Sequence, residues 1–80
     1  MTRVTLYSRG GCHLCELVER VLEHVRKSRA FDLEIRDIDQ NPADQAKYTN
    51  DIPVVTVNGV EIARHHLTAA AFEAALDKAT

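Results

Sequence analysis

The chain has 80 residues with no tryptophan, only two cysteines, two prolines and three glycines, and 5% aromatic residues. Its apolar runs stay far below the roughly 20 residues of a membrane-spanning helix, so none is expected. Neither sign of charge dominates, and the formal net charge of −2 argues against general binding to nucleic acid or anionic membranes. The rest of the composition, 45% hydrophobic and 28% charged, is that of an ordinary soluble protein.

Length and cysteine usage set two further expectations. A chain of 80 residues suffices for one small domain, expected to span residues 1–80. The N-terminus enters a strand pattern at Val4 without the apolar core of a signal peptide, so a cytoplasmic location is expected. In that reducing compartment a cysteine pair is more often catalytic or metal-binding than structural.

Both cysteines lie in the stretch Ser-Arg-Gly-Gly-Cys-His-Leu-Cys-Glu at residues 8–16. A strand pattern precedes this stretch and a long helical pattern follows it, which predicts Cys12 at a helix start and Cys15 one turn inside. A helix start offers unpaired N–H groups and the positive end of the helix dipole. Both effects favour the thiolate, so we expect the pKa of Cys12 to lie below that of an ordinary thiol.

This placement is suited to thiol–disulfide exchange, because only a thiolate attacks a disulfide. Cys12 is the predicted nucleophile and Cys15 the predicted resolving thiol, since residues three apart share a helical face. Gly10 and Gly11 permit a sharp turn and leave the approach to Cys12 open. A structural disulfide would close almost no loop, and a c-type haem site requires His where Glu16 stands.

Two charged neighbours are candidates for redox tuning. Arg9, three residues before Cys12, would favour the thiolate or an anionic substrate, and the competing interpretation is a solvated loop arginine. A protonated His13 would stabilise the thiolate and make the disulfide more oxidising. The competing interpretation of His13 is an exposed side chain that does not interact with the pair.

Apolar residues at helical spacing predict two longer helices, over residues 13–29 and 67–79, the second with Thr68 as candidate N-cap. A short helix opened by Pro42 is predicted over residues 43–49. The stripe expected to pack the first helix into the core is Leu14, Leu17, Val18, Val21, Leu22 and Val25. The expected packing face of the last helix is Leu67, Ala71, Phe72, Ala74, Ala75 and Leu76.

Four strands are predicted between these helices. The first spans residues 3–8, and strict alternation of apolar and charged residues predicts a second over residues 31–38 with one covered face. Asn58-Gly59 is a strong hairpin signal, which predicts antiparallel pairing of residues 54–57 with residues 60–63. The predicted architecture is α/β, in the order β-α-β-α-β-β-α, with a parallel first pair of strands and helices on both faces of a mixed four-stranded sheet.

Three features carry a resemblance to a known family: the stretch Leu-Tyr-Ser-Arg-Gly-Gly-Cys-His-Leu-Cys at residues 6–15, the stretch Ile-Pro-Val-Val-Thr-Val-Asn-Gly at residues 52–59, and the element order. Together they resemble the thioredoxin fold, and more closely its glutaredoxin-like branch. The Cys-His-Leu-Cys motif is similar to that of small bacterial glutaredoxin-like proteins. The resemblance covers nearly the whole chain and implies a thiol–disulfide oxidoreductase.

The resemblance also implies where substrate binds. In this fold the residue matching Pro53 is cis and faces the cysteine pair, and the residue matching Ile52 offers its backbone to an extended substrate. Arg9 matches a basic residue that glutaredoxins usually place three before the first cysteine. The implied substrate site therefore consists of Ile52, Pro53, Arg9 and Gly11.

Two departures from the glutaredoxin pattern concern the ligand. His13-Leu14 stands where Pro-Tyr is usual, and Ala-Arg-His-His-Leu at residues 63–67 replaces the Gly-Gly and Asp that help to hold glutathione. We therefore expect a weak glutathione site or none, so glutathione is only a candidate co-substrate. No cofactor is expected. The expected substrate is a disulfide-containing protein or a small thiol compound. The expected electron donor is a reductase or a low-molecular-weight thiol, and the protein is expected to be a monomer.

Two other functions stay open on the sequence. Cys12 and Cys15 with His65 and His66 are four ligands of the kind that hold zinc, although adjacent histidines diverge. An iron–sulfur cluster bridged by two chains is a variant of this metal hypothesis. The third hypothesis is a non-catalytic module that binds an extended peptide beside Pro53.

Overall fold

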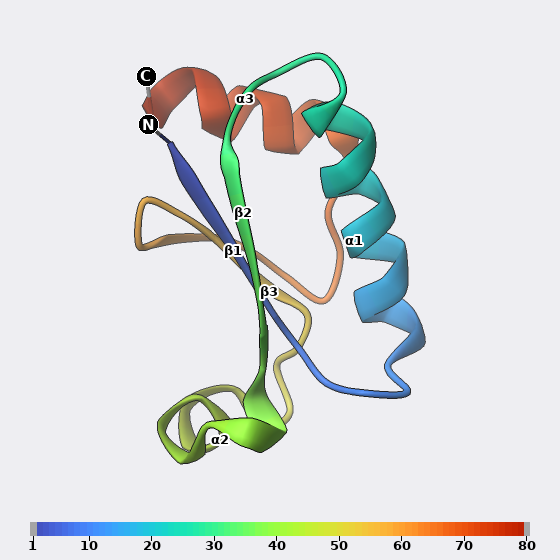
Figure 1. Cartoon of the computed structure of the whole chain (residues 1–80), viewed down its shortest axis with the longest axis vertical. Helices are drawn as coiled ribbons and strands as arrows, with labels where there is room; N and C mark the ends of the chain where they lie inside the picture. The colour runs from blue at the N-terminus through green and yellow to red at the C-terminus, as the bar shows by residue number, and fades with distance from the viewer. Residues whose placement is uncertain (1, 80) are drawn as a thin grey trace.

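The computed structural model describes residues 2–79 and has the element order β-α-β, a short 3-10 turn, then α-β-β-α (Figure 1). The strands are β1 (Arg3–Ser8), β2 (Asp32–Asp37), β3 (Val54–Val57) and β4 (Val60–Arg64). The helices are α1 (His13–Arg26), the 3-10 helix η1 (Ile38–Gln40), α2 (Pro42–Tyr48) and α3 (Ala69–Ala79).

The four strands form one mixed sheet in the order β2-β1-β3-β4. The central strand β1 pairs parallel with β2 and antiparallel with β3, and β3 pairs antiparallel with β4. In the hairpin turn both Asn58 and Gly59 have positive φ, at 51° and 84°, as a tight two-residue hairpin requires. The α/β class, the element order and the mixed four-stranded sheet predicted from the sequence are confirmed.

Helices cover both faces of this sheet. Val4 and Leu6 of β1 are fully buried on the face that α1 and α3 cover, where the Phe31 and Phe72 rings meet edge to face at 5.4 Å. Because side chains alternate along a strand, Tyr7 points to the opposite face. There the Tyr48 ring of α2 lies 4.6 Å from it, and Figure 1 shows α2 at the end of the molecule away from α3.

Two predicted boundaries were too long. Helix α1 ends at Arg26 rather than near residue 29, because the N–H groups of Lys27 and Ser28 bond to carbonyls three residues back, which tightens the last turn. Strand β2 is two residues shorter than predicted. It stops at Asp37, whose side chain accepts the N–H of Asp39 and opens the 3-10 turn that the sequence reasoning missed.

Smaller boundary shifts have similar local causes. Helix α2 begins at Pro42 rather than at residue 43, because the Asn41 side chain accepts the N–H groups of Ala43 and Asp44 as an N-cap. Strand β4 extends to Arg64, and α3 begins at Ala69 rather than at Leu67. Thr68 does cap α3, since its Oγ1 accepts the N–H of Ala71 at 3.1 Å.

The sequence predicted too many buried residues on α1 and β2. The buried residues of α1 form one narrow stripe: Cys15, Val18, Leu22 and Val25. Leu14 and Leu17 lie on its flank and are 50% and 42% exposed, so their predicted place in the core was wrong. Ile35 is 44% exposed because β2 is an edge strand of the sheet.

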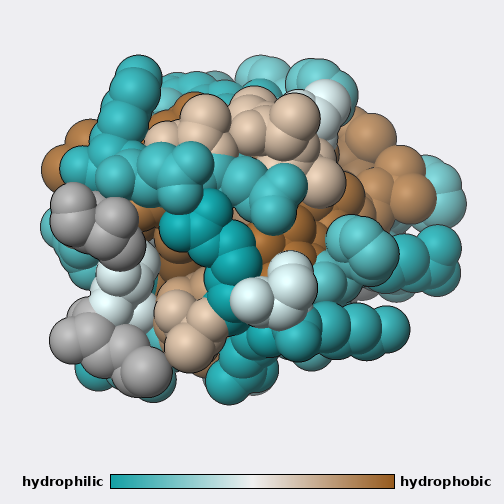
Figure 2. Space-filling model, turned by 90° about the horizontal axis from the view of Figure 1, so that it is seen from above, coloured by the Kyte–Doolittle hydropathy of each residue, from teal (hydrophilic) through white to brown (hydrophobic). Residues whose placement is uncertain are grey.

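Ala71 and Ala74 of α3 also face outward rather than packing into the core. With residues of the β3–β4 hairpin they line an open groove of about 480 Å³ between that hairpin and α3. Figure 2, which looks onto this end of the molecule, shows tan and brown hydrophobic surface between teal side chains. The groove lies at the end of the sheet where Val57 pairs with Val4, away from the end of β1 that leads to the cysteines. Within residues 2–79, no helix combines the length and apolarity needed to cross a membrane.

Candidate functional site

The cysteine pair lies where β1 ends and α1 begins. Cys12 is the N-cap residue of α1, and the two cysteines form a disulfide with their Cα atoms 5.2 Å apart. The Cys12 Sγ accepts the N–H of Cys15 at 3.2 Å. Cys12 is half-buried and Cys15 is buried, so one sulfur lies outside and its partner lies beneath it. An outer sulfur at a helix start with a second sulfur in bonding range is what disulfide exchange requires.

The turn into the helix depends on Gly11. Its φ is +75°, in the left-handed region that residues with a side chain rarely adopt. A Cβ built there would meet no atom within 4 Å, so the constraint on this position is the backbone conformation rather than space. The exposed Gly10 and Gly11 leave the side of Cys12 that faces the loop uncrowded.

Ile52 and Pro53 lie beside the end of β1. Tyr7 is paired with Val54, so continuing the antiparallel register puts Pro53 opposite Ser8, where the chain leaves β1 for the cysteines. The Ile52–Pro53 peptide bond is cis. The Pro53 carbonyl accepts the N–H of His65 at 2.7 Å, which ties this segment to the end of β4.

Arg9 is held by an acidic residue that the sequence reasoning did not single out. Its Nη2 lies 2.6 Å from Oδ1 of Asp39, and its Nε donates to Oδ2 at 3.2 Å. This hydrogen bonding raises the pKa of Arg9 and lowers the pKa of Asp39. A signal was available, because the carboxyl ends of neighbouring parallel strands adjoin. Asp37 ends β2 and Asp39 follows it, as Arg9 follows β1.

His13, the first residue of α1, directly follows Cys12. Its side chain is 80% exposed, and its Nδ1 lies 4.0 Å from the Glu16 carboxylate, one helical turn away. Exposure is compatible with both interpretations of His13, so its effect on the cysteine pair stays a prediction.

The structure does not assemble the suggested metal ligands. No group of three or more His, Cys, Asp or Glu side chains that could hold a metal ion occurs within residues 2–79. His65 instead lies 3.9 Å from the Asp51 carboxylate, which also pairs with Nη1 of Arg64 at 2.8 Å. These contacts join the segment before Pro53 to the end of β4.

Comparison with known proteins adds the family. A family model described as glutaredoxin-like domain (DUF836) matches residues 3–77. The chain belongs to this glutaredoxin-like family. A search among curated proteins gave no match.

Solved structures agree with the glutaredoxin-like assignment. The crystal structure of protein XcR50 from X. campestris is 32% identical, with a TM-score of 0.78, and the match covers 96% of this chain and 99% of that one. The solution structure of protein Ne2328 from Nitrosomonas europaea is 29% identical, with a TM-score of 0.79 and coverage of 92% and 89%. A thioredoxin variant from Halobacterium salinarum, 16% identical, shares the fold alone, with a TM-score of 0.74 over 96% of this chain and 73% of its own.

The ion pair of Arg9 and Asp39 makes stability depend on pH in a defined direction. Because the folded-state pKa of Asp39 is lowered, its contribution is fully present above the ordinary carboxyl pKa and is lost as pH falls through the lowered value. The difference in unfolding free energy between wild type and Asp39→Asn should therefore shrink as pH falls from about 5 to about 2. Urea denaturation at several pH values measures this difference, and a constant difference across that range would contradict the prediction.

Proposed function

We propose that this glutaredoxin-like protein is a thiol–disulfide oxidoreductase that works through the couple of Cys12 and Cys15. The observation that carries the proposal is the disulfide between a half-buried N-cap cysteine and a buried cysteine one turn into α1. In the reduced protein, the helix dipole and the N–H of Cys15 favour negative charge on the outer sulfur. The outer position makes Cys12 the nucleophile, and the inner position makes Cys15 the resolving thiol.

The proposed exchange has two steps that conserve electrons. The Cys12 thiolate attacks one sulfur of a substrate disulfide, forms a mixed disulfide with it, and expels the other sulfur as a thiolate. Cys15 loses its proton to solvent and attacks Sγ of Cys12, which forms the intramolecular disulfide and releases the second substrate thiolate. Two electrons pass to the substrate, and an external dithiol or two equivalents of a small thiol must return them for the next turnover.

The proposed substrate lies across the cysteine loop and the segment before β3. The half-buried Ile52 can offer its backbone to an extended chain beside Pro53, and Gly11 leaves the approach to Cys12 open. These features favour a disulfide-containing protein or a small disulfide as substrate. The cytoplasm as the location and a monomer as the working form stay parts of the proposal. The sequence at residues 63–67 favours little dependence on glutathione, and the exposed His13 is the proposed tuning residue.

Equilibrium redox titration tests the proposal. The protein is incubated in graded dithiothreitol buffers and in glutathione buffers, and the fraction of free thiol is read by alkylation and mass. We expect one reversible two-electron transition, in which a tenfold change in the buffer ratio corresponds to about 30 mV. The reduced protein should also reduce a disulfide-bonded protein, whereas a sample alkylated beforehand should not. A pair that resists reduction, or a reduced pair without reductase activity, would overturn the proposal.

A further inference from the structure

Asp39 already binds the guanidinium of Arg9, which is the arginine nearest in sequence to the nucleophile Cys12. Two nitrogens of the guanidinium, Nε and Nη2, engage the two oxygens of one carboxylate. This two-point geometry is the one in which arginine binds carboxylates most strongly. A substrate carboxylate that approached Arg9 by the same edge would have to displace Asp39.

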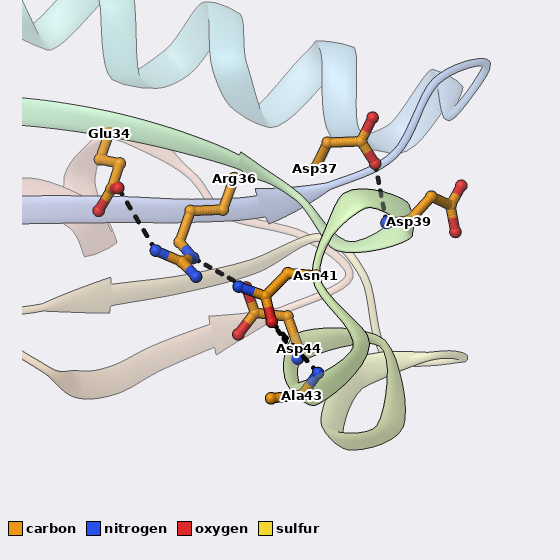
Figure 3. Close-up of polar contacts among 7 residues, drawn as sticks. All are labelled: Glu34, Arg36, Asp37, Asp39, Asn41, Ala43 and Asp44. Atoms are coloured by element: carbon orange, nitrogen blue, oxygen red, sulfur yellow. Dashed lines mark hydrogen bonds and ion pairs between the residues drawn. The ribbon is translucent and has the colours of Figure 1, made fainter.

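Asp39 is held in place from three sides. Its N–H donates to Oδ1 of Asp37 at 2.9 Å, and its own Oδ1 also accepts from Nε2 of Gln45 in α2 at 3.2 Å. Helix α2 is fixed in turn by its Asn41 N-cap and by Nε of Arg36 in β2, which lies 2.8 Å from Asp44 (Figure 3). Asp39 therefore meets Arg9 as part of a connected network of β2, η1 and α2.

Arg9 and Cys12 lie in the same short loop between β1 and α1. Arg9 is three residues from Cys12, and a chain of three residues spans at most about 11 Å. Ser8 is paired with Asp37 in the parallel register, so the loop that leads to Cys12 starts beside the segment that carries Asp39. Asp37 also contributes to the raised pKa of Arg9, which means that two carboxylates offset one positive charge there.

We infer that Asp39 is a specificity-determining residue of the dithiol site. By holding the guanidinium of Arg9, it withholds that cation from incoming substrates, so disulfides that carry a carboxylate near the scissile bond gain nothing from it. The inference rests on the proposed disulfide exchange and goes beyond it, because it names the class of substrate that the site disfavours. Neutral disulfides have no carboxylate for Arg9 to bind, so any effect of Asp39 on them acts through the thiols and is shared with the anionic disulfides.

The physical reason is competition within one molecule. Asp39 is already ordered beside Arg9, so it does not lose the translational freedom that a free carboxylate loses on binding. Asn in its place keeps an acceptor for Gln45 but has no charge for Arg9. The Arg9 side chain then becomes available to an external anion, and the local repulsion of that anion falls as well.

Two small disulfides of similar size test the inference. Reduced protein is mixed with neutral 2-hydroxyethyl disulfide or with dianionic 3,3′-dithiodipropionate, and the second-order rate of its oxidation to the Cys12–Cys15 disulfide is measured. The ratio of the anionic to the neutral rate is the readout, since it cancels general effects on folding or on the thiols. Asp39→Asn should raise this ratio about fivefold at low salt, and added salt should reduce the gain.

Three comparisons decide the outcome. In an Arg9→Gln background, Asp39→Asn should leave the ratio unchanged within twofold, because the cation it would release is gone. Asp32→Asn, at the far end of β2, changes net charge equally and should also leave the ratio unchanged. An unchanged ratio in Asp39→Asn, or an equal rise in either comparison variant, would overturn the inference alone. Failure of wild type to react with either disulfide would overturn the proposed function and the inference together.

Discussion

Cys12→Ser is expected to reduce the rate of disulfide reduction to the uncatalysed background, a loss of roughly three orders of magnitude. A serine hydroxyl at the N-cap is not ionised at neutral pH and cannot displace a sulfur from a disulfide. Serine is itself a favourable N-cap, so α1 should keep its start at His13 and the variant should fold. The measurement is the reduction rate of a disulfide-bonded protein, with circular dichroism as the check on folding.

Cys15→Ser should behave differently from Cys12→Ser, and the difference assigns the two roles. The outer Cys12 sulfur can still attack, but no inner thiol resolves the product, so the mixed disulfide with substrate should accumulate. Mass spectrometry without reductant should detect one substrate adduct on Cys15→Ser and none on Cys12→Ser. Accumulation of the adduct on Cys12→Ser instead of Cys15→Ser would reverse the two proposed roles. Full turnover by Cys12→Ser would show that Cys12 is not the nucleophile.

The parts of the fold that the sequence predicted well are those with local causes. Alternation of side chains identifies a strand wherever it lies, and Asn58-Gly59 determines its own turn. The strand-to-helix position of Cys12 follows in the same way from the patterns on either side of it. Such features do not depend on how the helices later pack.

Apart from the element boundaries, the errors concern which surfaces meet, and this depends on tertiary packing. Leu14 and Leu17 fit a helical apolar stripe, yet an 80-residue domain has too little core to cover a stripe that wide. Ile35 alternates correctly but lies on an edge strand. The pairing of Arg9 with Asp39 joins residues 30 positions apart, and only the parallel register of β1 and β2 brings them together.

Phe72→Ala should strongly reduce the stability of the fold. Phe72 of α3 is fully buried and meets Phe31 edge to face, so alanine would remove the ring contact and leave a cavity between α3 and the sheet. Such truncations cost about 3–5 kcal/mol, against a total stability of roughly 5–15 kcal/mol for a small domain. Val60→Ala is the matched control, because Val60 is 66% exposed and its loss should cost under about 0.5 kcal/mol.

Urea denaturation of the wild type and of each variant, oxidised and at neutral pH, measures these costs. The unfolding midpoint of Phe72→Ala should fall far below that of Val60→Ala, or the variant should be largely unfolded without denaturant. Phe72→Leu should lie between them, since it keeps most of the buried apolar volume. Equal midpoints for Phe72→Ala and Val60→Ala would mean that α3 does not pack on this core. Because α1 contributes Val18, Leu22 and Val25 to the same cluster, loss of this packing would also weaken the support of the helix that Cys12 caps.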